Sequence, residues 1–147
     1  MEEIIELRHY IESGKYQDAL GLLDEMEEMS RDDKINRISS FMEVLLLHLI
    51  KQAAEQRTTR SWDVAIRNSL HQITKINKRR KAGGWYLTNE ELRVALLEAY
   101  APALDTASLE AFEGTHTPEE IDSMTNRAAI LDSAFARIVR QSESEPH

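Results

Sequence analysis

The fold is decided by residues 32–54, DDKINRISSFMEVLLLHLIKQAA. One set of apolar residues in this stretch recurs at three- and four-residue intervals: Ile35, Ile38, Met42, Leu45 and Leu49. That spacing is typical of one face of an α-helix. More apolar residues widen the face until the helix is hydrophobic almost all round: Phe41, Val44, Leu46, Leu47 and Ile50. Because such a helix normally lies at the centre of its domain, we expect a core helix from Asp32 to about Ala54, capped by Ser30.

Helical periodicity also accounts for most of the remaining sequence, whereas alternating strand patterns and hairpin dipeptides are absent. Before the core helix we expect helices at about 2–13 and 15–29, joined at Gly14 as an antiparallel hairpin. The inward-facing residues of the second helix would be Tyr16, Ala19, Leu20 and Leu23. After the core helix we expect helices at about 61–80 and 103–112, and two more that open at Thr88 and Thr117.

Local signals define several of these helix ends. Thr88 with Glu91, and Thr117 with Glu120, have the spacing of a capping box, and Pro102 should break or kink its helix. The last helix carries an apolar seam suited to a partner helix: Ile121, Met124, Ala128, Leu131, Phe135 and Ile138. We therefore predict an all-α fold, a single compact bundle of six or seven helices at residues 1–140, followed by a flexible C-terminal tail at residues 141–147.

Composition narrows the function. The 147 residues are 41% hydrophobic and 30% charged, which suits one soluble globular domain. Because the chain has no Cys, disulfides, thiolate catalysis and Cys-ligated metal sites are excluded. The longest apolar run, Val44 to Ile50, is far shorter than the roughly 20 residues that span a bilayer. The acidic N-terminus is unlike a signal peptide, so we expect a cytoplasmic protein that does not enter a membrane.

Charge is unevenly distributed along the chain. Residues 1–33 carry 3 basic and 11 acidic groups, residues 57–81 carry 8 basic groups and one acidic group, and residues 82–147 carry 4 basic and 12 acidic groups. The net charge of −8 argues against a dedicated nucleic-acid binder, since phosphate contacts supply most of such affinity. The layout instead favours pairing of the basic segment with the acidic ends of its own chain or of a second copy.

Catalytic candidates are few. His48 lies in an apolar setting, where it could serve as a general base, although a core histidine bonded to a backbone carbonyl or a carboxylate is the favoured interpretation. Arg60 opens a helix, where a cation is unfavourable, so we expect a carboxylate partner for it. The candidates for that partner are Glu25, Glu28, Glu43 and Glu55. A hydrolase or nuclease would combine His48, Arg60 and Glu25 or Glu28. The histidines are scattered, so we expect no metal and no cofactor.

The basic segment at residues 75–86 is the other candidate. Cations followed by two aromatic residues could hold phosphates and stack on a base: Arg79, Arg80, Lys81, Trp85 and Tyr86. Alternatively, the cations stabilise a helix C-terminus and the aromatic rings fold back over the core, which is the favoured interpretation. Exposed rings would indicate a ligand site, and buried rings would indicate a structural role.

Two motifs resemble the hallmark of a bacterial, mainly cyanobacterial, family called domain of unknown function 29. They are LLLHLIK at residues 45–51 and RSWDVAI at residues 60–66, and the similarity extends from Tyr16 to about Ser108. Many members carry a tryptophan directly after the lysine, where this chain has Gln52. The resemblance implies an all-helical bacterial cytoplasmic protein and supplies no activity. His48, Arg60 and Trp62 are motif positions with no assigned role.

Three functional hypotheses follow. The preferred one is a non-enzymatic protein-interaction or self-association module, whose partner would be a second copy or another protein. The first alternative is nucleic-acid or phosphate-ligand binding through residues 75–86. The second is a hydrolase or nuclease centred on His48.

Overall fold

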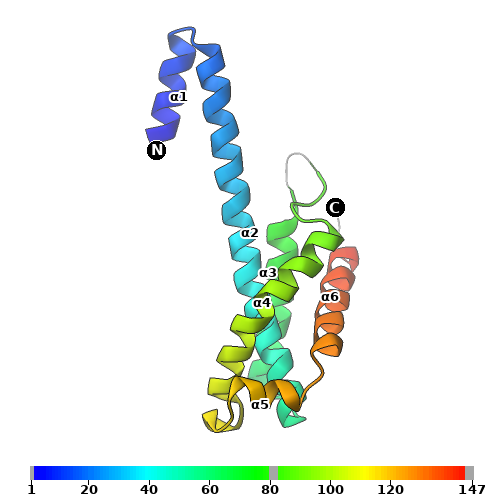
Figure 1. The fold of residues 1–147 in the computed structure, drawn as a ribbon. Helices are drawn as coiled ribbons and strands as arrows, with labels where there is room; N and C mark the ends of the chain where they lie inside the picture. The colour runs from blue at the N-terminus through cyan, green and yellow to red at the C-terminus, as the bar shows by residue number, and fades with distance from the viewer. Residues whose placement is uncertain (1, 80–82, 145–147) are drawn as a thin grey trace.

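The chain folds into six α-helices and one short 3-10 turn, as a computed structural model describes for residues 2–79 and 83–144 (Figure 1). The elements are α1 (Glu2–Glu12), α2 (Tyr16–Glu55), α3 (Arg60–Asn77), α4 (Asn89–Glu110), η1 (Ala111–Gly114), α5 (Pro118–Ser123) and α6 (Arg127–Ser144). Within those ranges the only β-type pairing is an isolated bridge between Lys78 and Trp85. The prediction of an all-α bundle is confirmed.

The core helix is the second half of a longer helix. α2 runs for 40 residues, about 60 Å, without interruption. The predicted separation of two helices at Ser30 is therefore wrong. The polar residues at 30–34 include no Gly or Pro, and Ser and Asp are tolerated inside a helix when their side chains face water.

The second half of α2 forms the centre of the bundle, as expected. Its most buried side chains have no exposed surface: Ile38, Met42, Leu45, Leu46 and Ile50. α3 and α4 pack along this half, and α6 closes the remaining side. The matching residues of the covering helices are small or aliphatic, and Tyr100 of α4 is 1% exposed.

α1 and the first half of α2 form an arm, residues 2–30, that extends beyond the other helices (Figure 1). The hairpin expected at Gly14 is present, and this glycine has the left-handed φ of 73° that such a turn requires. The arm is much less buried than predicted, since no residue of α1 is buried. Of the four residues expected to face inward on the second helix, Ala19 is buried, whereas Tyr16, Leu20 and Leu23 are exposed.

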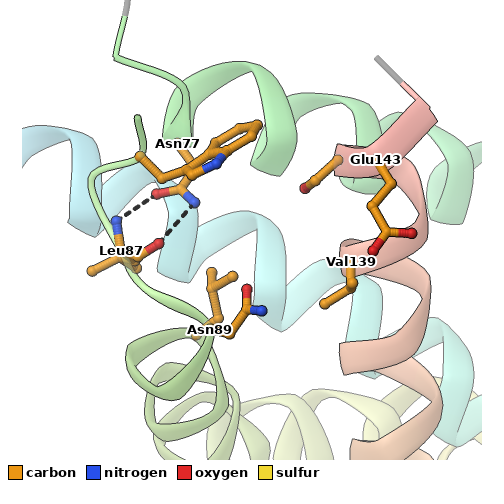
Figure 2. Close-up of a pocket in the computed structure, with 8 residues that line it drawn as sticks. Asn77, Leu87, Asn89, Val139 and Glu143 are labelled. Atoms are coloured by element: carbon orange, nitrogen blue, oxygen red, sulfur yellow. Dashed lines mark hydrogen bonds between the residues drawn. The ribbon is translucent and has the colours of Figure 1, made fainter. Parts of the chain in front are cut away.

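α3 is fixed at both ends by side chains. The Thr59 hydroxyl accepts a hydrogen bond from the Trp62 N–H at 3.1 Å, which starts the helix. At the other end, the buried Asn77 side chain donates to the Leu87 carbonyl at 3.2 Å and accepts from the Leu87 N–H at 2.8 Å (Figure 2). This pair of bonds holds the returning chain against the helix end, so α3 ends three residues before the predicted end at Arg80, which lies outside the described residues.

α4 continues through Pro102, so the predicted break there is wrong. Proline removes one backbone hydrogen bond, but the buried face of the helix on both sides of it packs on α2. That face consists of Ala99, Tyr100, Ala103 and Leu104. The chain leaves α4 through η1, in which Phe112, Glu113 and Gly114 all have positive φ.

The predicted last helix is two helices. Both expected capping boxes are present, but α5 ends at Ser123, and the Asn126 side chain accepts a hydrogen bond from the Ala129 N–H to start α6. The predicted seam is broken as a result, because Met124 and Ala128 are exposed. Ile121 and Ile138 of that seam are buried, as expected, and Ile130 and Ala134 of α6 also face the core. α6 continues to Ser144 and so includes the first four residues of the predicted tail, while residues 145–147 lie outside the described residues.

The capping box of α4 generates a pH-dependent prediction. The Thr88 N–H bonds the Glu91 carboxylate at 3.1 Å and holds the pKa of Glu91 below its ordinary value. A lowered pKa in the folded state means that Glu91 contributes stability above its unfolded pKa and loses that contribution as the pH falls through its folded pKa. We expect Glu91→Gln to lower the urea midpoint more at pH 7 than at pH 3, where Glu91 is closer to its protonated form. An equal loss at both pH values would contradict this role.

Candidate functional site

The two family-like motifs meet at the end of the bundle opposite the arm, in a group we call the motif cluster: Lys51, Glu55, Arg57, Trp62 and Glu110. Lys51 is 5% exposed, and its Nζ lies 2.8 Å from Oε1 of Glu110. The same ammonium lies 4.6 Å from the centre of the Trp62 ring, and the Arg57 guanidinium lies 4.9 Å from it. The cluster therefore ties the end of α2 to the start of α3 and the end of α4.

The turn between α2 and α3 is held by polar side chains. Gln56 ends α2 with a left-handed φ of 52°. The Thr58 hydroxyl then donates to Asp63 at 2.8 Å, and Gln52 donates to Thr58 at 2.8 Å. These contacts position the start of α3, and with it the Trp62 ring under the two cations.

Glu55 connects this turn to η1. Its Oε1 accepts a hydrogen bond from Nε of Arg57 at 2.9 Å, and its Oε2 accepts one from the Phe112 N–H at 3.3 Å. All three non-glycine residues with positive φ among the described residues lie beside this contact: Gln56, Phe112 and Glu113. A non-glycine residue in that conformation costs about 1–3 kcal/mol and persists only where its surroundings enforce it.

The motif cluster borders an open hollow of about 600 Å³, but its charged groups are largely committed to one another. Lys51 is paired with Glu110, and Arg57 is paired with Glu55. None of the residues that line this hollow is a Ser, Cys or His, so the site offers no side-chain nucleophile of those types and no imidazole. The arrangement fits a structural clamp better than a catalytic centre.

Arg60 does not have the carboxylate partner that we expected. Its side chain is exposed at the start of α3 and forms no ion pair with any described residue. Glu55, one of the expected partners, binds Arg57 instead. The other candidates lie farther back on α2: Glu43 precedes the end of that helix by 12 residues, or about 18 Å, and Glu28 precedes it by 27 residues, or about 40 Å.

The residues required for hydrolysis are not brought together. Glu28 precedes His48 by 20 residues on one continuous helix, which places them about 30 Å apart, and Glu25 is farther still. Nδ1 of the half-buried His48 lies 2.9 Å from the Val44 carbonyl, as in the structural interpretation of this residue. No group of three or more His, Asp or Glu in the described ranges could hold a metal ion.

The basic segment faces carboxylates of the arm. Arg79, Trp85 and Tyr86 line a hollow of about 490 Å³ together with Asp24, Glu27 and Glu28. Both aromatic residues are half-buried, so they match neither the exposed rings of a ligand site nor the buried rings of a structural role. The Arg79 guanidinium lies 5.8 Å from the centre of the Tyr86 ring. Arg31 also lines this hollow, but the three carboxylates outnumber the two arginines and disfavour a bound phosphate. Arg80 and Lys81, the other two candidates, lie outside the described residues.

A smaller hollow of about 210 Å³ lies between the chain that follows α3 and the end of α6 (Figure 2). Val139 and Glu143 line its far side, and Asn89 lies at its floor. The Asn77 amide, the most buried polar group there, is already used by the two bonds to Leu87. The Asn77 amide is therefore not available to recognise a ligand in this hollow.

Sequence reasoning missed an exposed apolar face on the arm. We define the arm face as five residues that are 41–64% exposed: Ile4, Ile11, Tyr16, Leu20 and Leu23. Helical periodicity identified an apolar side of each helix, but periodicity does not reveal whether anything covers that side. The residues of the hairpin that are not exposed are different ones, and we take them to form the contact between its two helices: Leu7 and Tyr10 of α1 and, on α2, Ala19, Leu22 and Met26.

The five residues of the arm face lie on one side of the hairpin. Viewed along the axis of each helix, these residues are rotated by about a quarter turn from the contact residues. The sense of this rotation is the one in which the helix winds from its N-terminus to its C-terminus. Because α1 and α2 are antiparallel right-handed helices, a quarter turn along each chain direction leads to the same side of the pair. The arm thus presents a continuous apolar strip about 15 Å long.

Residues 7–136 match the model of a family described as Domain of unknown function DUF29. No curated protein and no solved structure matches the chain. In the described part of the chain, every helix is too short or too polar to cross a membrane.

The motif cluster makes a stability prediction. Removing the carboxylate with Glu110→Ala leaves the buried Lys51 ammonium without its partner, so we expect a loss of about 1–3 kcal/mol in the free energy of unfolding. The double variant Lys51→Met/Glu110→Ala should recover most of that loss, because no buried charge remains. Urea unfolding followed by circular dichroism measures both, and a double variant no more stable than Glu110→Ala would contradict the clamp.

Proposed function

The chain belongs to this family of unknown function, and we propose that it is a non-enzymatic module that associates with a second copy of itself through the arm face. The main observation in support of this proposal is that the five apolar side chains of that face are exposed. Contiguous exposed apolar patches on soluble proteins mark interaction surfaces.

The arm is poorly supported within one chain. α1 has 11 residues and none is buried, whereas isolated helices shorter than about 12–15 residues are marginal in water. Covering five side chains that are about half exposed would contribute roughly 4–7 kcal/mol for each copy. Association would thus provide the burial that α1 lacks.

A second copy suits the arm face because identical apolar surfaces can pack across a twofold axis. The face on α2 lies opposite a row of exposed carboxylates: Asp18, Glu25 and Asp32. Those carboxylates point away from a partner that covers the face, so two copies can approach without bringing these groups together. Two hairpins packed in this way would form an intermolecular four-helix bundle.

The alternatives have less support. The acidic lining around Arg79 disfavours nucleic-acid binding through residues 75–86, and the distance from His48 to the glutamates disfavours a hydrolase. The family-like motifs support a bacterial, mainly cyanobacterial, cytoplasmic protein as part of this proposal. If the module also binds a partner other than a second copy, we propose that this partner is another protein and not a membrane.

Charge substitution in the arm face tests the proposal. At 500 mM salt and high micromolar concentration, we expect light scattering to give a mass near twice the 16.9 kDa of one chain. Leu20→Glu/Leu23→Glu should give the single-chain mass, because association would bury the introduced carboxylates. Its melting temperature at low concentration should equal that of the wild type, since both side chains are exposed in one chain.

Val94→Glu/Leu97→Glu provides the matched control. These residues are 53% and 60% exposed on α4, away from the arm, so this variant should still associate. A wild-type protein that remains a single chain at high micromolar concentration would refute the proposed self-association.

A further inference from the structure

α3 carries a row of cations along its exposed face, which we call the cationic ridge: Arg60, Arg67 and Lys75. The three residues are spaced by seven and eight positions, so they lie on one side of the helix over about 22 Å. None of them forms an ion pair with a described residue. Asp63, the one acidic residue of α3, lies between Arg60 and Arg67 on this side of the helix, and its carboxylate accepts hydrogen bonds from Thr58 and Gln52.

α2 carries a row of opposite charge and equal length, which we call the acidic ridge: Asp18, Glu25 and Asp32. The residues are seven positions apart, which places them on one side of the helix over about 21 Å. All three are exposed and form no ion pair within the described part of the chain. The two rows thus match in length, in spacing and in number of charges.

We infer that the cationic ridge of one copy binds the acidic ridge of another, and that this contact links the proposed dimers into larger assemblies. The inference rests on the proposed function, because the acidic ridge lies on the side of α2 opposite the arm face. Arms that pair through their apolar faces therefore leave both ridges open to further copies. A contact between two different surfaces leaves one of each surface open on every pair that it joins, so it can continue from dimer to dimer.

The expected contact is weak and sensitive to salt. Exposed ion pairs each contribute little, and salt screens them over about 10 Å at 0.1 M. A dimer carries each ridge twice, so repeated contacts raise the overall affinity. Pairing through the arm face is apolar and withstands high salt, so the two contacts separate by ionic strength.

A second copy fits the cationic ridge better than a nucleic acid does. The chain itself supplies an acidic row with the matching spacing, whereas its net charge of −8 repels polyanions. Nucleic-acid binding remains a measurable alternative and is one outcome of the test below.

The test measures mass at two salt concentrations in four samples. We expect the wild type to exceed the dimer mass at 20 mM salt and to fall to the dimer at 500 mM. Arg67→Glu/Lys75→Glu and Asp18→Lys/Glu25→Lys should each remain dimers at both concentrations. An equimolar mixture of these two variants should again exceed the dimer mass at 20 mM salt, because every reversed ridge then meets an oppositely charged one.

The control is Arg37→Glu/Arg140→Glu, which changes the net charge as much as the cationic-ridge variant does. Both arginines are exposed and lie off the ridges, so this variant should assemble like the wild type. The inference would be overturned if Arg67→Glu/Lys75→Glu still assembled like the wild type, or if the mixture failed to assemble. Neither outcome would affect the arm-face dimer, which is measured separately at 500 mM salt. Binding of fluorescent duplex DNA at 150 mM salt that Arg67→Glu/Lys75→Glu abolishes would also overturn the inference, since the ridge would then serve nucleic acid.

Discussion

The structure depends on burial of the second half of α2. Five of its side chains have no exposed surface, and α3, α4 and α6 are held in place by packing around them. Because α2 is one uninterrupted helix, the same packing also fixes the direction in which the arm leaves the bundle. A hydrophobic core at one end of a rigid helix thereby positions an apolar surface at its other end.

The strongest sequence motif serves this architecture. LLLHLIK supplies core residues together with Lys51, and RSW supplies the ring that lies against the Lys51 ammonium. A lysine so deeply buried is unfavourable unless it is paired, and Glu110 at the end of α4 provides the pair. The motif residues therefore join the adjacent ends of α2 and α3 to the end of α4, which is distant in sequence, and this gives them a structural role.

Much of the fold was predictable from the sequence because its signals are local. The central helix and both capping boxes depend on neighbouring residues, and all three are confirmed. The predicted breaks at Ser30 and Pro102 were wrong for different reasons: the polar residues at 30–34 face water and include no Gly or Pro, whereas the buried face of α4 is packed on both sides of Pro102. The arm face could not have been predicted, since the sequence shows that Leu20 and Leu23 are apolar but not that the neighbouring helices end before reaching them.

The charge pattern gains meaning only in three dimensions. Totals along the chain describe an acidic beginning and a basic middle, but they do not distinguish pairing within one chain from pairing between copies. In the fold, the basic segment and the acidic arm face each other in one place, where Arg79 lines the same hollow as Asp24, Glu27 and Glu28. The cationic ridge of α3 and the acidic ridge of α2 are exposed and aligned, and neither forms an ion pair with any residue that the structure describes. Two straight rows on different helices of a rigid molecule favour contact between molecules, because neither helix can bend to reach the other.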